Sequence, residues 1–348
     1  MLRKARFKNF TCVPNDTWLF APGLNVIVGE NGLGKTHVLK ALYAMLKVRA
    51  DAKDLSKSLL EKAYADKLVG VFRPESLGRL AKRKQGRERC ELHLSFDDTR
   101  LDAAIGFATN AKSQVEVLHL PSQKLELSPV YFPPRELVTL APWFVSLYDN
   151  FHVEFEETWR DTVSMLGNPL RKGPREKEIA KLLQPLEDVL GGKVVVDAQT
   201  GRFYLQIPAE GRMEMPLVAE GLRKIAMLAH LISSGTLLEK GFLFWDEPEA
   251  NLNPKLIKTV AKSIAAIAAK GVQVFIATHS LFLMREIEIF LSNHAKDSKP
   301  LYAHFFGLHD AGKDGVRMEQ ADDLAGIGSI TALEESLLQS DRYLAAGD

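Results

Sequence analysis

A glycine-rich stretch near the start of the chain has the residues needed to bind phosphate. Residues 29–36 are Gly-Glu-Asn-Gly-Leu-Gly-Lys-Thr, which fits the pattern G-x-x-x-x-G-K-[ST]. Glycines allow the backbone to wrap closely around phosphates, while a lysine reaches the terminal phosphates and a threonine hydroxyl suits Mg²⁺. We therefore expect a nucleoside triphosphate with Mg²⁺ here, unless the match is a chance glycine turn before a helix. The residues expected to bind it are Asn31, Gly32, Leu33, Gly34, Lys35, Thr36 and His37.

A pair of carboxylates follows an apolar run much later in the chain. Asp246 and Glu247 end the segment Phe-Leu-Phe-Trp-Asp-Glu. Adjacent acids at the end of a buried strand are costly unless they share a metal or a proton. Asp246 suits the Mg²⁺ ion opposite Thr36, and Glu247 suits activation of an attacking water as a general base. The alternative is a strand end whose acids are simply solvated.

A histidine ends the next apolar run. His279 closes Val-Phe-Ile-Ala-Thr-His and lies one predicted helix after the Asp-Glu pair. The carboxyl ends of neighbouring parallel strands meet at one edge of a sheet, so we expect His279 near the terminal phosphate. A purely structural histidine is the alternative.

The elements that must position these residues are apolar strands separated by helices. Strands are predicted at 23–30, 241–250 and 272–280, and helices at 35–50, 221–235 and 253–271. This alternation predicts an α/β fold with a parallel sheet. Alternating segments at 90–98, 104–110 and 114–120 add antiparallel strands, residues 128–137 a strand that stops at a double proline, and residues 192–207 a hairpin.

The domain organisation follows from where this pattern is interrupted. We expect one domain over 1–348, with a core lobe at about 1–136 and 192–348 and an inserted helical lobe at about 137–191. A polar and basic helical insertion is expected at about 52–89. Its basic part, 73–89, is open to three interpretations: nucleic-acid contact, a surface for a protein partner, or a solvated charged helix. Its cations are Arg73, Arg79, Lys82, Arg83, Lys84, Arg87 and Arg89.

Composition limits the class of protein. Hydrophobic residues make up 46% of the chain, which is enough to form a large core. The net charge is only +1, so the chain as a whole has no electrostatic attraction for nucleic acid. The two cysteines, Cys12 and Cys90, do not suggest a disulfide framework. Neither a signal-peptide h-region nor an apolar run of membrane-spanning length is evident. We expect a cytoplasmic protein with no membrane partner.

Taken together and in this order, the motifs resemble the ABC/SMC superfamily of ATPases, most closely its RecF-like and OLD-like branch of stand-alone prokaryotic ATPases. The segments that carry the resemblance are FKNFTC, VGENGLGKT, YFPPREL, AEGLRK, FLFWDEPEANLNP and IATHS. The resemblance implies a P-loop ABC-type ATPase head with mixed sheets that binds ATP and Mg²⁺. It also implies Walker A and B motifs at 29–36 and 242–246 and a D-loop around 250–253. It makes Lys35, Glu247 and the switch residue His279 catalytic.

The resemblance further implies a signature motif before the second strand. Ala219, Glu220 and Gly221 occupy that place, where the family contacts the nucleotide of the other subunit in a homodimer. The family usually has serine where this chain has Ala219, and Arg223 or Lys224 is a candidate replacement for the lost contact. An ordinary helix start is the alternative. Similarly, Arg135 or Glu136 is a candidate for the family's glutamine loop, unless the segment is only a lobe boundary.

The implied function is an ATPase that dimerises around ATP and controls a partner. The spacing of the motifs excludes long coiled-coil arms, and the residues after His279 are too few for a Toprim nuclease. We therefore expect a separate effector protein, a nuclease or toxin, in DNA maintenance or anti-phage defence. One alternative is a non-hydrolysing scaffold clamped by ATP. Another is a P-loop GTPase or kinase, although the N-K-x-D motif of GTPases is absent.

Overall fold

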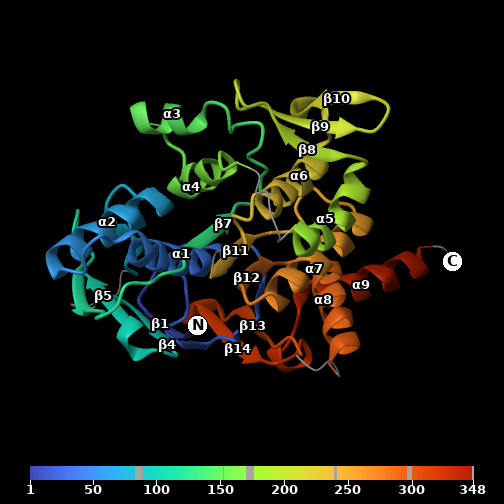
Figure 1. Cartoon of the computed structure of the whole chain (residues 1–348). Coiled ribbons are helices and arrows are strands. Elements are labelled where there is room, and N and C mark those ends of the chain that lie inside the picture. The colour runs from blue at the N-terminus through green and yellow to red at the C-terminus, as the bar shows by residue number, and fades with distance from the viewer. Residues whose placement is uncertain (83–88, 152, 170–175, 239–240, 296–299, 347–348) are drawn as a thin grey trace.

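The computed structural model describes residues 1–82, 89–151, 153–169, 176–238, 241–295 and 300–346. Its centre is a six-stranded sheet in the order β14-β13-β3-β12-β11-β7 (Figure 1). All of its neighbouring strands are parallel except β14, which pairs antiparallel with β13. The strands are β3 (Leu24–Gly29), β7 (Pro129–Phe132), β11 (Phe242–Asp246), β12 (Gln273–Thr278), β13 (Ala303–Asp310) and β14 (Val316–Ala321).

The register of this sheet gathers the carboxyl ends of three strands. Asp246 of β11 pairs with Ala277 of β12, and Thr278 pairs with Val28 of β3. The loops that follow β3, β11 and β12 therefore leave the sheet at one edge. This confirms the predicted parallel arrangement of the strands that carry the glycine loop, the acid pair and the histidine.

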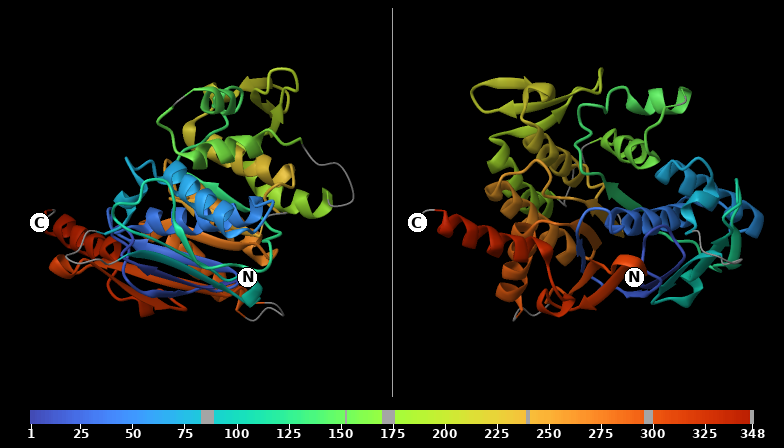
Figure 2. Two further views of the ribbon diagram at one scale, coloured as in Figure 1. Left: turned by 90° about the vertical axis from the view of Figure 1, so that its left-hand side faces the viewer. Right: turned by 180° about the vertical axis from the view of Figure 1, so that it is seen from behind.

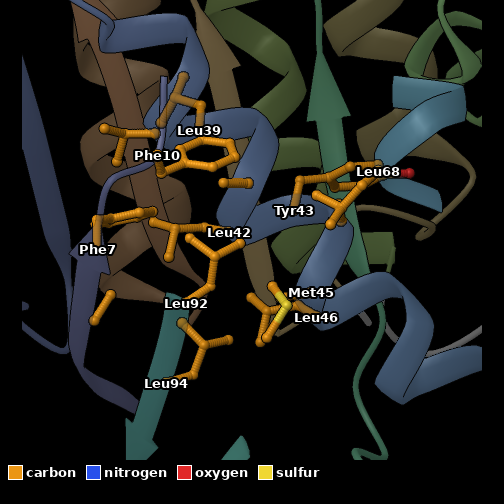
Figure 3. Packing of buried hydrophobic residues seen from close by; sticks show 14 of the residues in the cluster. Phe7, Phe10, Leu39, Leu42, Tyr43, Met45, Leu46, Leu68, Leu92 and Leu94 are labelled. Carbon is orange, nitrogen blue, oxygen red and sulfur yellow. The ribbon is translucent and has the colours of Figure 1, made fainter. Parts of the chain in front are cut away.

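A five-stranded antiparallel sheet faces the central sheet across helix α1 (Lys35–Asp51). Apolar residues of both sheets pack on this helix. Leu92 and Leu94 of the outer sheet lie in one cluster with Leu42 and Met45 of α1 (Figure 3). The outer strands are β1 (Leu2–Lys8), β2 (Thr17–Leu19), β4 (Cys90–Phe96), β5 (Ala103–Phe107) and β6 (Glu116–His119). Of these, β4, β5 and β6 confirm the predicted antiparallel segments.

The opposite face of the central sheet is covered by α6 (Glu220–Ser233), α7 (Pro254–Ala269) and α8 (Leu281–His294). The period-2 alternation of β11 divides its side chains between the two cores. Phe244 belongs to the α1 core, whereas Leu243 and Trp245 belong to the core under α6 and α7. Helices α6 and α7 confirm the sequence prediction, while α8 was not predicted.

Helices α3 (Phe144–Asn150), α4 (Glu157–Leu166) and α5 (Glu176–Leu190) lie within the segment expected to form a helical lobe. The hairpin β8 (Lys193–Val196) and β9 (Phe203–Ile207) is confirmed, and β10 (Gly211–Glu214) extends it to three strands. Both views show this small sheet at the same end of the molecule as α3 and α4 (Figures 1 and 2). The lobe boundaries themselves stay a prediction.

The expected helical insertion at 52–89 is helical only in part. Helix α2 (Lys57–Phe72) ends at Phe72, and a 3₁₀ turn at Leu77–Leu80 follows before Ala81 bridges to Phe10. The helix is not wholly polar either, because Leu60, Tyr64 and Leu68 are buried in the α1 core. Arg83, Lys84 and Arg87 lie outside the described residues.

The C-terminal part adds helix α9 (Thr331–Ala345), which extends from the body of the molecule (Figure 1). Within the described parts of the chain, no helix combines the length and apolar character needed to cross a bilayer. Further 3₁₀ turns lie at Thr99–Leu101, Met215–Leu217, Gly312–Asp314 and Ala325–Ile327.

Candidate functional site: a phosphate loop facing an acid pair

The glycine loop joins β3 to α1 with a backbone that needs glycine. Gly32 and Gly34 have φ of 86° and 94°, in the left-handed region where a side chain is strained. A Cβ on Gly34 would also lie 2.9 Å from the sulfur of Cys12. The first N–H groups of α1 have no partner within the helix and form its positive end. The loop and helix start therefore present a site suited to an anion.

Lys35 is buried at the base of this loop. Its Nζ donates hydrogen bonds to the carbonyls of Gly29, at 2.7 Å, and Glu30, at 2.8 Å. Burial lowers the pKa of Lys35, while the nearby carboxylates of Glu247 and Asp246 act in the opposite direction. A cation is thus fixed between the loop backbone and the acid pair.

Thr36 and Asp246 meet across the gap between the two motifs. The threonine Oγ1 donates to the Asp246 carboxylate, 2.9 Å from Oδ2 and 3.1 Å from Oδ1. Asp246 is only 3% exposed, and this burial raises its pKa to about 6. Tyr131 Oη donates a further hydrogen bond to Oδ2, at 3.3 Å.

A hydroxyl and a carboxylate at one point form a donor set that fits Mg²⁺, which takes hard oxygen ligands. Within the described ranges, no group of three or more His, Cys, Asp or Glu side chains is arranged to hold a metal ion unaided. The donor set therefore fits an ion that also takes oxygens from phosphate and water, and Thr36 and Asp246 would hold it.

Glu247 and His279 face each other beside this point. His279 Nδ1 lies 3.3 Å from Glu247 Oε1, and the histidine side chain is half exposed. Glu247 has φ of 45°, and its N–H donates to the carbonyl of Ala277 at 2.9 Å. Strand β12 therefore orients the loop that carries the glutamate, and both side chains are directed to the same place.

Two residues at the site were not predicted. Tyr131 hydrogen-bonds Asp246, and Glu249 accepts a 2.6 Å hydrogen bond from Thr278 Oγ1 directly behind His279. A second acid two residues after the Asp-Glu pair was a visible signal for Glu249. Tyr131 had no such signal, because it reads as an ordinary strand residue.

The structure does not bring the expected signature residues to the same place. Ala219 and Gly221, at the N-terminus of α6, line a different cavity of about 650 Å³ together with Asn251 and Asn253. Glu220 accepts a hydrogen bond from Asn251 Nδ2, at 3.1 Å. Ala219 is the N-cap of α6 and makes no capping hydrogen bond with its side chain.

A separate cavity of about 350 Å³ lies beside the glycine loop. It is lined by Glu30, Asn31 and His279, and by tail residues that include His309 and Thr331. Thr331 Oγ1 donates to Glu30 Oε1 at 2.8 Å, so the start of α9 is attached to the loop. The C-terminal tail therefore forms one wall of the space next to the phosphate site, which sequence analysis did not predict.

Several predicted residues are engaged elsewhere. The side chain of His37 contacts Thr11 Oγ1 at 2.9 Å, so only its backbone faces the loop. Arg223 forms an ion pair with Glu136 at 3.2 Å, which ties α6 to the segment after β7. The ammonium of Lys224 is buried and bonded to backbone carbonyls, which leaves it no exposed charge to offer a phosphate.

Much of the described part of the basic segment is also paired within the protein. Arg73 donates to the carbonyls of Phe155 and Val153. Arg79 and Arg89 form ion pairs with Glu75 and Glu116, at 2.6 and 2.5 Å. Nucleic-acid contact through 73–89 stays a prediction with fewer free cations than the sequence suggested.

The sequence of the chain was compared with models of known protein families. A family model described as "AAA domain, putative AbiEii toxin, Type IV TA system" matches residues 69–285, well over half of the chain. The matched segment contains the acid pair and the start of α6, whereas the glycine loop precedes it. Among curated proteins, none matches the sequence of this chain.

Solved structures resemble the chain in fold. One is an SmcHead bound to the C-winged helix domain of ScpA, with a TM-score of 0.57 and 14% identity over 92% of this chain and 97% of that one. Another is an Smc head domain with an extended coiled coil from Pyrococcus furiosus, bound to the C-terminal domain of ScpA. It has a TM-score of 0.51 and 12% identity over 98% and 99% of the two chains. The fold is that of an ABC/SMC-like ATPase head, as predicted, while the RecF-like or OLD-like branch stays a prediction.

Proposed function

We propose that this chain, which belongs to the AAA-domain family whose model it matches, hydrolyses ATP with Mg²⁺, dimerises around the nucleotide and controls a separate effector protein. The observation that carries the proposal is the meeting of Thr36 with Asp246, at 2.9 Å, directly beside Glu247 and His279. A phosphate-binding loop, a metal donor pair and a candidate base thereby share one edge of the sheet.

Each group has a role that its position supports. The N–H groups at the start of α1 and the Lys35 ammonium bind and neutralise the phosphates. Thr36 and Asp246 hold Mg²⁺, which supplies charge stabilisation at the phosphates when bound. Glu247 orients and deprotonates the attacking water, and His279 fixes the glutamate while facing the terminal phosphate.

The dimer accounts for the residues that lie apart from the loop. Ala219 and Gly221 line a cavity of their own, so in the proposed dimer they contact the nucleotide that is bound to the second copy. The similar Smc heads are described as bound to domains of ScpA, which supports a protein partner for this head too. The family description names a toxin of a type IV toxin–antitoxin system, which supports an anti-phage or DNA-maintenance setting.

A non-hydrolysing scaffold is the second candidate, and one observation favours it. Ala219 caps α6 without a side-chain hydrogen bond, where the resembling family has a serine hydroxyl for the partner's phosphate. A missing donor at that position weakens activation across the dimer, and ATP then serves as a clamp.

Phosphate release separates the two functions. We expect the wild-type chain to release phosphate from ATP only with Mg²⁺, and Glu247→Gln to lower the rate by about 10²–10⁴ while ATP still binds, because a positioned general base supplies that factor. Glu286→Gln, a change on helix α8 at a residue outside the proposed site, is the matched control and should leave the rate unchanged. A wild-type rate equal to that of Glu247→Gln would favour the scaffold.

A further inference from the structure

A buried lysine connects the N-terminal part of α6 to the loop that carries Glu247. Lys224 is 2% exposed, and its Nζ donates to the carbonyl of Glu247 at 2.6 Å, with Ala250 O at 3.4 Å. Burying an ammonium is unfavourable unless hydrogen bonds and nearby charges compensate. Burial lowers the pKa of Lys224 to about 8, and the carboxylates of Glu249 and Glu247 oppose that effect. The buried ammonium of Lys224 therefore depends on its hydrogen bonds to this loop.

The loop it contacts has a backbone that needs support. Glu247 has a positive φ of 45°, which is strained for a residue with a long side chain, and Asn251 has a φ of 63°, which asparagine tolerates better. The Glu247 carbonyl accepts from the N–H of Ala250, at 3.1 Å, as well as from Lys224. Such a conformation persists only when its surroundings fix it, and the lysine supplies one of the fixing bonds.

The tip of α6 rests on the far end of the same loop. Asn251 Nδ2 donates to Glu220 Oε1, and a Cβ on Gly221 would lie 2.5 Å from the carbonyl oxygen of Asn251. The helix start and residues 247–251 therefore touch at Asn251 and again at Lys224, about one helical turn further along. A displacement of one must displace the other.

We propose that Lys224 is a positioning residue that makes the start of α6 and the Glu247 loop a single unit, so that whatever engages residues 219–221 also sets the orientation of Glu247 in the same chain. This inference rests on the proposed function for its catalytic consequence. In a dimer around ATP, the nucleotide of one copy would touch α6 of the other and thereby align that copy's own glutamate. The two ATP sites would then be coupled through Lys224.

The test replaces the ammonium and keeps the volume. In Lys224→Met, we expect amide hydrogen exchange at Glu247, Ala250 and Leu252 to rise at least tenfold without nucleotide, because the loop loses the hydrogen bond that the lysine donates to the Glu247 carbonyl. We also expect kcat for ATP to fall 10- to 100-fold with KM changed less than threefold. Lys258→Met, at an exposed position on α7, is the matched control and should change neither quantity.

The outcomes are distinguishable from a failure of the proposed function. Unchanged exchange in a folded Lys224→Met, with a melting temperature equal to wild type, would overturn the positioning role whatever the activity. Faster exchange with unchanged kcat would overturn the coupling to catalysis. If the wild-type chain turns over no ATP, the proposed function fails, and the exchange result still decides whether Lys224 fixes the loop. ATP-dependent dimerisation of Lys224→Met in a Glu247→Gln background should match that of Glu247→Gln alone.

Discussion

At the scale of single residues, Asp246 combines a charge with almost complete burial. The Thr36 and Tyr131 hydroxyls donate to its carboxylate, yet desolvation outweighs these bonds and raises its pKa from 3.8 to about 6. A carboxylate in this state is stabilised by a bound cation, which is the property a metal ligand needs. Because of the same burial, ionisation of Asp246 without a bound cation lowers the free energy of unfolding.

This cost has a defined pH dependence. Because the folded pKa exceeds the unfolded one, the favourable contribution of Asp246 is present below about pH 4 and is lost as the pH rises through about 6. Asp246→Asn keeps both hydrogen bonds and removes the ionisation. In metal-free chemical denaturation, the Asn variant should gain stability relative to wild type between pH 4 and 7, by up to about 3 kcal/mol. A difference that does not vary with pH would contradict this account of the residue.

At the scale of elements, a buried polar cluster ties α1 to α2 and α4. Asp161 of α4 accepts from Tyr43 of α1 and from Lys67 of α2, both at 2.6 Å. Lys67 also pairs with Glu157 at 2.8 Å. Helix α1, which starts at the phosphate loop, is thus joined to α4 through the Tyr43 hydroxyl and the Asp161 carboxylate. The same carboxylate joins both helices to α2 through Lys67.

Removing the shared carboxylate should loosen this junction. Asp161→Ala leaves the Tyr43 hydroxyl and part of the Lys67 charge unpaired in the interior, so we expect a loss of about 3 kcal/mol in the free energy of unfolding. Urea denaturation measures it. Glu75→Ala removes the partner of an exposed ion pair and is the control, with an unchanged midpoint expected. Equal midpoints for the two variants would mean that the cluster does not stabilise the junction.

The elements around the site were predictable because their signals are local. A run such as Leu24–Val28 reads as a buried strand, and the glycine pattern fixes a turn before a helix. The alternation of strands and helices predicts the parallel arrangement that brings Asp246 to the same edge of the sheet as the glycine loop. The composition of 52–89 predicts a polar helix, but α2 buries Leu60, Tyr64 and Leu68, a face that charged residues between these positions conceal in the sequence.

The supporting contacts were not predictable, because they join residues far apart in sequence. Tyr131 meets Asp246 only after β7 pairs with β11, and Thr331 meets Glu30 only after the tail returns to the loop. The charge of Lys224 makes it, like Arg223, a candidate for a phosphate contact, whereas the packing of α6 directs its ammonium inward to the Glu247 carbonyl. Such contacts depend on tertiary geometry, for which no local pattern exists.

At the scale of the whole molecule, the start of α6 lines a cavity apart from the glycine loop, and this separation is the reason we propose a dimer around the nucleotide. Ala219 is the position where a side chain changes the contact across such a dimer and leaves the fold intact. Serine and aspartate are both good N-caps, so either substitution should stabilise α6 by a similar amount.

Their effects on assembly should nevertheless be opposite. In a Glu247→Gln background with ATP, Ala219→Ser adds a hydroxyl donor for phosphate and should tighten the dimer several-fold. Ala219→Asp places a negative charge against the phosphate and should weaken it at least tenfold. Mass measurement in solution over a range of concentrations gives both dissociation constants. Equal dimerisation by the two variants would exclude contact between Ala219 and the partner's nucleotide.

A double-mutant cycle on ATP affinity shows whether the glycine loop and the acid pair hold one Mg²⁺–ATP complex between them. Thr36→Val, Asp246→Asn and the double variant are titrated with ATP in Mg²⁺ and again in EDTA. If both side chains bind the same ion, each single variant should lose about tenfold of the Mg²⁺-dependent affinity. The double variant should lose hardly more, and this non-additivity should vanish in EDTA. Additive losses in Mg²⁺, or a wild-type chain that binds no ATP at saturating concentration, would contradict the account.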